Sequence, residues 1–249
     1  MNELSVIIPS YHSKALTLIC IESFERFKSK GMEMTYIVIE NSDDISYRDD
    51  VLNSATNVKW MINPTKLRGS DANADALRIG LKEVKSEFVF LCHCDTCVAS
   101  KLFFDELLKK AKDGYRMVGT GLDNTRINAC HISGIFVDTE IARSVDMFPS
   151  YQNCKMIMDV GDDITKYCRD NDIKHTCLNN TYNLFDEGSL LDDKYRGFRV
   201  NRSVNKSGEV LFMHLGRGIP KTQGVYKKEG RIYLAEWIAF CRRLLSDKS

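Results

Sequence analysis

The sequence predicts an α/β protein with a mostly parallel central sheet and helices on both faces. Short apolar runs alternate with segments of helical periodicity through the first 120 or so residues, which is the pattern that builds parallel sheets. The runs are continuously apolar, as in strands buried on both faces. With 249 residues and 43% hydrophobic side chains, the chain can bury one large core without disulfides. We therefore expect a single domain over residues 1–249.

The predicted elements follow from these patterns in order. The expected strands are 5–8, 35–39, 57–62, 87–92, 115–120, 132–137 and 173–178, and the expected helices are 16–27, 70–84, 102–111, 162–171 and 232–245. The polar stretch 203–209 is expected to be a mobile loop. We expect the last helix to pack on the core, and peripheral contact with a membrane is the alternative because it is amphipathic.

Composition and charge exclude several classes of function. A net charge of +1 provides no general attraction for nucleic acid or for an anionic membrane. The nine cysteines are an odd number without a framework spacing, which favours reduced thiols in the cytoplasm. The start of the chain has no signal-peptide pattern, and no apolar run reaches the roughly 20 residues of a membrane span.

Polar and aromatic side chains follow four successive predicted strands. These groups are Pro9-Ser10-Tyr11, Glu40-Asn41-Ser42-Asp43, Asn63-Pro64 and His93-Cys94-Asp95-Thr96. In an open parallel sheet, ligands bind beyond the carboxyl ends of the strands. The sequence therefore predicts a binding site at this edge.

His93 and Asp95 are candidate metal ligands. Residues two apart at the end of an extended strand point the same way. A carboxylate suits Mg²⁺ or Mn²⁺, and imidazole shifts the preference towards Mn²⁺. The alternative is a loop histidine with a helix-capping aspartate. The neighbouring Cys92, Cys94 and Cys97 lack the partner pair of a zinc cluster, so we expect buried thiols.

Four motifs together resemble the family 2 glycosyltransferases, the large inverting GT-A group, and the resemblance implies a GT-A-like single domain. They are Leu4–Tyr11, Val38–Ser42, the Asn63 to Leu77 segment with its Gly69-Ser70 loop, and Phe88–Asp95. His93 stands where the family has the first aspartate of Asp-x-Asp, while Asp95 keeps the second. The chain has no Gln-x-x-Arg-Trp motif, which argues against a processive synthase.

The resemblance implies roles for residues in the first half. Pro9 and Tyr11 would line the base pocket, and Glu40 would accept hydrogen bonds from the nucleoside, in the first instance a uracil ring. Asp71 and Asn73 would border the nucleotide. Asp95 would hold Mn²⁺ or Mg²⁺ at the diphosphate. Residues 1–98 would form the nucleotide-binding half, 99–220 the acceptor and metal half, and 221–249 a C-terminal loop and helix.

A catalytic base is expected at the start of the predicted helix 162–171, and the candidates are Asp159, Asp162 and Asp163. Asp163 is the first choice and Asp162 the reserve, because the pair resembles the family's acidic motif, with Arg169 six residues further on. Adjacent acids also raise one pKa, which suits a base. The alternative is that these acids only stabilise the helix N-terminus.

The segment Val210–Gly218 resembles the late histidine segment of GT-A enzymes. There His214 would be a third metal ligand, and Arg217 and Lys221 would contact the diphosphate. The alternative is a core histidine beside an ordinary turn.

The resemblance implies a non-processive transferase of glycan biosynthesis. It would move a sugar from a nucleotide-sugar donor, such as a UDP-sugar, to a hydroxyl of a glycan, a lipid-linked molecule or a small molecule. The reaction would be a metal-assisted direct displacement with inversion, in the cytoplasm and without nucleic acid. Two alternatives remain open: a sugar nucleotidyltransferase and a non-catalytic nucleotide-sugar-binding relative.

Overall fold

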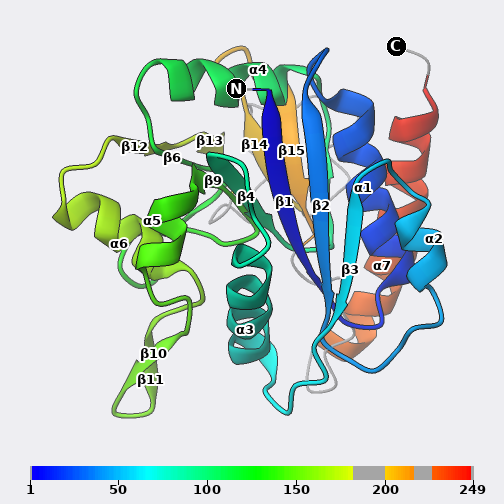
Figure 1. The fold of residues 1–249 in the computed structure, drawn as a ribbon, viewed down its shortest axis with the longest axis horizontal. Helices are drawn as coiled ribbons and strands as arrows, with labels where there is room; N and C mark the ends of the chain where they lie inside the picture. The colour runs from blue at the N-terminus through cyan, green and yellow to red at the C-terminus, as the bar shows by residue number, and fades with distance from the viewer. Residues whose placement is uncertain (1, 182–199, 216–225, 248–249) are drawn as a thin grey trace.

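A seven-stranded sheet forms the centre of the computed structural model, which describes residues 2–181, 200–215 and 226–247 (Figure 1). In spatial order its strands are β12 (His175–Cys177), β6 (Met117–Gly119), β9 (Gly134–Asp138), β4 (Phe88–Cys92), β1 (Glu3–Ser10), β2 (Glu33–Glu40) and β3 (Val58–Ile62). Strands β4, β1, β2 and β3 are parallel, and so are β12 and β6. Only β9 runs antiparallel to its neighbours within this sheet. The predicted mostly parallel sheet is confirmed.

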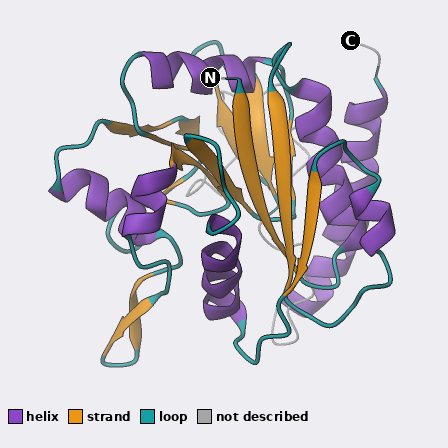
Figure 2. Cartoon of the chain, in the orientation of Figure 1, coloured by secondary structure: helices purple, strands orange, loops and turns teal. Residues whose placement is uncertain are grey.

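Helices cover both faces of this sheet, as predicted (Figure 2). One core cluster includes side chains of α1 (Lys14–Phe27), α2 (Arg48–Leu52), α4 (Leu102–Lys112) and α7 (Tyr226–Ser246). The second includes side chains of α3 (Gly69–Leu81), α5 (Thr139–Ser144) and α6 (Asp162–Asp170). The β1 side chains alternate between the two clusters, because successive residues of a strand point to opposite faces. Ile7 belongs to one cluster and Ile8 to the other.

A second, antiparallel sheet joins the two halves of the chain. Its order is β13 (Asn179–Asn180), β14 (Asn201–Val204), β15 (Val210–His214) and β5 (Thr96–Val98). Two small hairpins complete the strands: β7 (Leu122–Asp123) with β8 (Ala129–Cys130), and β10 (Ser150–Gln152) with β11 (Lys155–Met158).

The expectation of a loop over 203–209 is wrong at its start, because Ser203 and Val204 belong to β14. Both residues are buried, and the Ser203 hydroxyl donates to the carbonyl of Thr120 (2.5 Å). The turn that follows is held by the Asn205 side chain, which accepts from the backbone N–H of Glu209 (2.9 Å). A short strand with polar residues such as Ser203 resembles a loop in sequence, because the sequence does not show that the serine hydroxyl has a buried hydrogen-bond partner.

The terminal helix α7 packs on α1, as expected. Trp237 and Cys241 of α7 are fully buried. Within the described residues, no helix is both long and apolar enough to cross a membrane. All nine cysteines are free thiols, and Cys92, Cys94 and Cys97 are buried in the core as predicted.

The close approach of α3 to β1 gives a stability prediction. A Cβ on Gly80 would lie 2.6 Å from Cγ2 of Ile7, which is closer than the two carbons can approach. We expect Gly80→Ala to lower the free energy of unfolding by about 1–3 kcal/mol, as overpacking does, despite the gain in helix propensity. Urea unfolding measures the change.

The matched control is the same substitution in an Ile7→Ala background, where the obstructing atoms are gone. There Gly80→Ala should cost little or should stabilise. An equal cost in both backgrounds would contradict the packing explanation.

Candidate functional site

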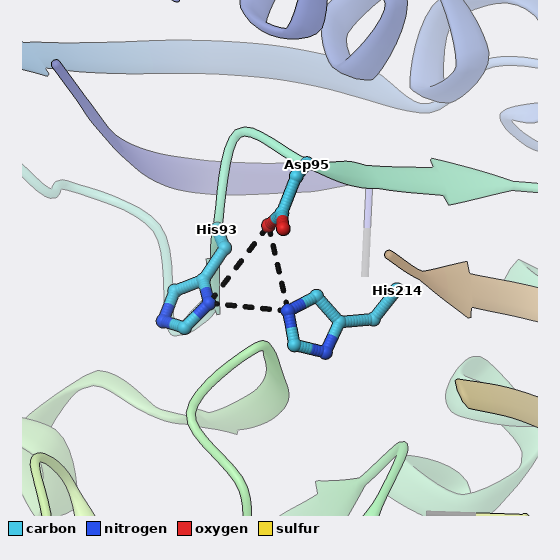
Figure 3. Close-up of side chains that lie close together, drawn as sticks. All are labelled: His93, Asp95 and His214. Atoms are coloured by element: carbon cyan, nitrogen blue, oxygen red, sulfur yellow. Dashed lines mark hydrogen bonds and ion pairs between the residues drawn. The ribbon is translucent and has the colours of Figure 1, made fainter. Parts of the chain in front are cut away.

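Three candidate metal ligands lie together beyond the end of β4 (Figure 3). His93 Nδ1 is 3.3 Å from His214 Nε2 and 3.9 Å from Asp95 Oδ1, and His214 Nε2 is 3.4 Å from Asp95 Oδ1. Asp95 and His214 are buried, and His93 is about a quarter exposed. The three side chains therefore present one nitrogen or oxygen each to a common point.

The local backbone explains why His93 and Asp95 face the same way. The extended backbone of β4 ends at Cys92, before His93, and the chain turns through Cys94 and Asp95 into β5. The Thr96 hydroxyl donates to the carbonyl of His93 (2.8 Å) and closes this turn. The shared direction of His93 and Asp95 thus comes from a turn and not from an extended strand.

His214 is brought to the turn by strand pairing. In the antiparallel β15–β5 ladder, His214 lies opposite Thr96, and the next N–H, of Leu215, donates to the Asp95 carbonyl (3.0 Å). Side chains at such neighbouring cross-strand positions lie within contact distance. The pairing places His214 beside Asp95, although the two are far apart in sequence.

The geometry fits one face of a divalent cation. Metal–ligand bonds of about 2.0–2.2 Å put neighbouring ligand atoms roughly 3 Å apart at right angles, close to the separations observed. Burial alone would raise the pKa of Asp95, but the adjacent His214 and His93 more than offset it and hold that pKa well below its usual range. The carboxylate is therefore ionised and available as a ligand.

A third histidine that the sequence reasoning missed adjoins this group. The His131 ring centroid is 5.6 Å from that of His93 and 5.5 Å from that of His214. Burial and the two neighbouring rings lower the pKa of His131 well below its usual value, which keeps it neutral. Its Nδ1 lies 2.9 Å from the Ser133 hydroxyl.

The position of His131 follows from the direction of β9. Because β9 is antiparallel to β4, with Gly134 opposite Cys92, the residues before β9 lie at the edge where β4 ends. A parallel strand would have begun at the opposite edge. His93, His131 and His214 come from segments far apart in the sequence, so their convergence is visible only in the fold.

Glu40 is fully buried at the end of β2. Its Oε1 accepts from the backbone N–H of His12 (3.1 Å) and from the Ser42 hydroxyl (2.5 Å), and its Oε2 accepts from the Tyr47 hydroxyl. The Tyr47 hydroxyl is also 2.9 Å from the Ser10 hydroxyl. Glu40 thus fixes the turn after β1 to the end of β2.

The other predicted nucleotide residues occupy several positions at this edge. Pro9 is buried in β1, opposite Ile39. Tyr11 is 50% exposed, and Asp71 is half-buried in the first turn of α3. Asn73 contacts a ligand candidate directly, with its Nδ2 3.0 Å from His93 Nε2. Arg217 and Lys221 lie outside the described residues.

Asp162 and Asp163 lie at the N-terminus of α6, where the helix was expected to begin. Their environments differ. Asp162 is buried, and its Oδ2 accepts from the backbone N–H of Asp159 (2.8 Å) and from Arg126 Nε (3.1 Å). Burial raises its pKa, and these two donors offset only part of the rise. Asp163 accepts a long bond (3.4 Å) from the Asp146 N–H. Among the described residues, no contact joins Asp163 to the cluster of His93, Asp95 and His214.

Arg126, which was also not predicted from the sequence, links α6 to the site. It lies in the β7–β8 hairpin and pairs with Asp123 (2.7 Å) as well as Asp162. The same hairpin leads directly into His131. Arg169 instead donates to the carbonyls of Ile127 and Asn128, which anchors α6 to the hairpin.

Two solved structures illustrate what this chain is similar to. The S. aureus TarS 1-349 structure has 16% identity and a TM-score of 0.48 over 59% of this chain and 50% of TarS. Glucosyl-3-phosphoglycerate synthase from Mycobacterium tuberculosis, solved with Mn²⁺, UDP and glucosyl-3-phosphoglycerate, has 14% identity and a TM-score of 0.49 over 71% of this chain and 70% of the synthase. The matched part of TarS 1-349 is thus only half of that structure. At this level of similarity, residue roles and substrates do not transfer.

The family assignment rests on the sequence. No curated protein matches this chain. The family model described as glycosyl transferase family 2 matches residues 5–130, just over half of the chain. That range contains His93, Asp95 and Glu40, together with all the strand-end motifs described above. The chain belongs to glycosyl transferase family 2.

Proposed function

We propose that this protein transfers a sugar from a nucleoside diphosphate donor, a UDP-sugar in the first instance, to a hydroxyl acceptor with inversion. The observation that carries the proposal is the convergence of His93, Asp95 and His214 at the carboxyl edge of a family 2 sheet. The chain would act non-processively in the cytoplasm as a single domain. The acceptor would be a glycan, a lipid-linked molecule or a small molecule.

The three convergent side chains would hold a divalent cation. When bound, Mn²⁺ or Mg²⁺ would neutralise charge on the departing diphosphate. Two imidazoles among three ligands favour Mn²⁺, because Mg²⁺ prefers oxygen ligands. Arg217 and Lys221 follow His214 along the chain and are proposed to contact the same diphosphate.

The nucleoside would lie along the ends of β1 and β2. Tyr11 presents an exposed ring that can stack on a base, next to Pro9. Asp71 would border the ribose and phosphates from α3. Glu40 is fully buried, so its contact with a uracil ring requires the Tyr11–His12 turn to shift. Without that shift, the hydrogen bond that Glu40 accepts from the His12 N–H would support the proposed base pocket.

Asp163 is the proposed catalytic base, with Asp162 in reserve. The base removes the proton from the acceptor hydroxyl while that oxygen attacks the anomeric carbon and the diphosphate leaves. A single displacement of this kind inverts the configuration. The Asp162 carboxylate already accepts hydrogen bonds from Arg126 and from the Asp159 N–H, whereas the Asp163 bond to the Asp146 N–H is long, so the Asp163 carboxylate is more available to an acceptor hydroxyl.

The cation site gives a binding prediction. Asp95→Asn and His214→Ala each remove a proposed ligand and should weaken Mn²⁺ binding. The loss should exceed the roughly 10–100-fold expected when a residue that only hydrogen-bonds to a ligand is removed. Wild-type protein should bind Mn²⁺ more tightly than Mg²⁺. Calorimetry measures both, and a shift in melting temperature with UDP and Mn²⁺ reports the donor site.

The matched control is His175→Ala, which removes a histidine outside the cluster and should leave Mn²⁺ affinity unchanged. A wild-type protein that binds neither Mn²⁺ nor a nucleoside diphosphate would refute the proposed function.

The base gives a kinetic prediction. Asp163→Asn should lower the rate of transfer by roughly 10²–10⁴-fold, the usual contribution of general base catalysis, and should leave donor binding nearly intact. Asp162→Asn, which weakens the Arg126 ion pair, should mainly lower thermal stability. Release of UDP and melting curves measure the two effects.

The reverse result, in which a folded Asp162→Asn protein loses transfer and Asp163→Asn retains it, would reassign the base. Donor binding without transfer or hydrolysis by wild-type protein would instead favour the non-catalytic alternative.

A further inference from the structure

We propose that Asn73 and Asn201 are positioning residues that fix the tautomers of His93 and His214. This inference rests on the cation site of the proposed function. The two histidines face the common point with different ring nitrogens, His93 with Nδ1 and His214 with Nε2. On each ring, the nitrogen facing away lies next to an asparagine amide.

A neutral imidazole carries one N–H and one lone pair. A cation takes the lone pair, so the proton must sit on the outer nitrogen and needs an acceptor there. His93 must then carry its proton on Nε2, and His214 on Nδ1. Without such acceptors, each ring would also populate the tautomer that points a proton at the cation.

Asn73 can supply the acceptor for His93. The amide oxygen and nitrogen of asparagine exchange places by a half-turn of the terminal group. In the present orientation Nδ2 is 3.0 Å from His93 Nε2, while Oδ1 is buried without a hydrogen-bond partner among the described residues. The half-turn would bring Oδ1 to the His93 N–H, so the unmet acceptor gains a donor when His93 adopts the metal-binding tautomer.

Asn201 stands in the equivalent place for His214. It lies directly opposite His214 in the antiparallel β14–β15 ladder, and its Nδ2 is 3.5 Å from His214 Nδ1. Cross-strand neighbours on one face keep this proximity through the backbone. Its amide, turned in the same way, accepts from the Nδ1–H.

The two asparagines come from unrelated elements, the helix α3 and the strand β14. Metal-binding histidines generally donate their second N–H to an outer partner, which orients the ring. An amide does this without adding a charge, so the cation keeps its full attraction for the donor. Asn73 therefore acts on the nucleotide through His93 rather than by touching it.

Paired variants test the acceptor role. Asn73→Leu and Asn201→Leu remove the acceptor at similar volume and should each weaken Mn²⁺ binding by roughly 10–100-fold. Asn73→Asp and Asn201→Asp keep an oxygen acceptor and should restore the affinity to within about threefold of wild type or better. Asn57→Leu, at an exposed asparagine, should have no effect. Calorimetry with Mn²⁺ alone is the readout.

A second measurement needs no variant. The ¹⁵N spectrum of the imidazoles in wild-type protein saturated with Zn²⁺, a diamagnetic substitute for Mn²⁺, should show the Nε2–H tautomer for His93 and the Nδ1–H tautomer for His214 at pH 8. The opposite tautomer at either ring, or Leu variants that bind Mn²⁺ like wild type, would overturn this inference and leave the cation site standing. Failure of wild-type protein to bind Mn²⁺ would refute the cation site and this inference with it.

Discussion

The antiparallel pairing of β15 with β5 is the constraint on which the whole candidate site depends. It joins β5, which lies inside the family-matched segment, to a strand more than 100 residues later and sets His214 beside Asp95 within a few ångströms. A shift of one residue in this register would turn His214 to the other face of the sheet. The side chains on both faces of β15 are buried, so such a shift would also exchange the apolar side chains that pack on the two faces. The packing of β15 therefore also positions a polar ligand.

The second constraint is the reversed direction of β9 in an otherwise parallel neighbourhood. It returns the chain to the carboxyl edge of β4, where His131 contacts His93 and His214. The hairpin just before it carries Arg126, which holds Asp162 at the start of α6. One antiparallel strand thus connects the cation-binding side chains to the helix that carries the acids. Asp162 and Asp163 differ because this contact buries one of them.

The first half of the fold was predictable because its signals are local. Strands β1, β2 and β4 each contain a continuous apolar run, and α1 and α3 show helical periodicity. The sheet of β13, β14, β15 and β5 was less visible, since its strands are two to five residues long and Ser203 looks like a loop residue. His93, Asp95 and His214 could be proposed from motifs. His131 and Arg126 could not, because strand direction and hairpin pairing have no local signature.

A histidine in place of a second aspartate at position 93 changes the net charge of the cation site. A divalent cation bound by Asp95 and two neutral imidazoles keeps a net charge of +1, whereas a second carboxylate would cancel it. The charge of the ion itself dominates such a site, and the ligand to be held is a diphosphate anion. In a chain with a net charge of only +1, retained local charge is useful for binding that anion. If the proposed function holds, His93 lowers the affinity of the site for the cation but strengthens the binding of the diphosphate. The neutral side chains of Asn73 and Asn201 leave this net charge unchanged. A decayed site would have no physical reason to keep both amides on the outer nitrogens of its two ligand histidines.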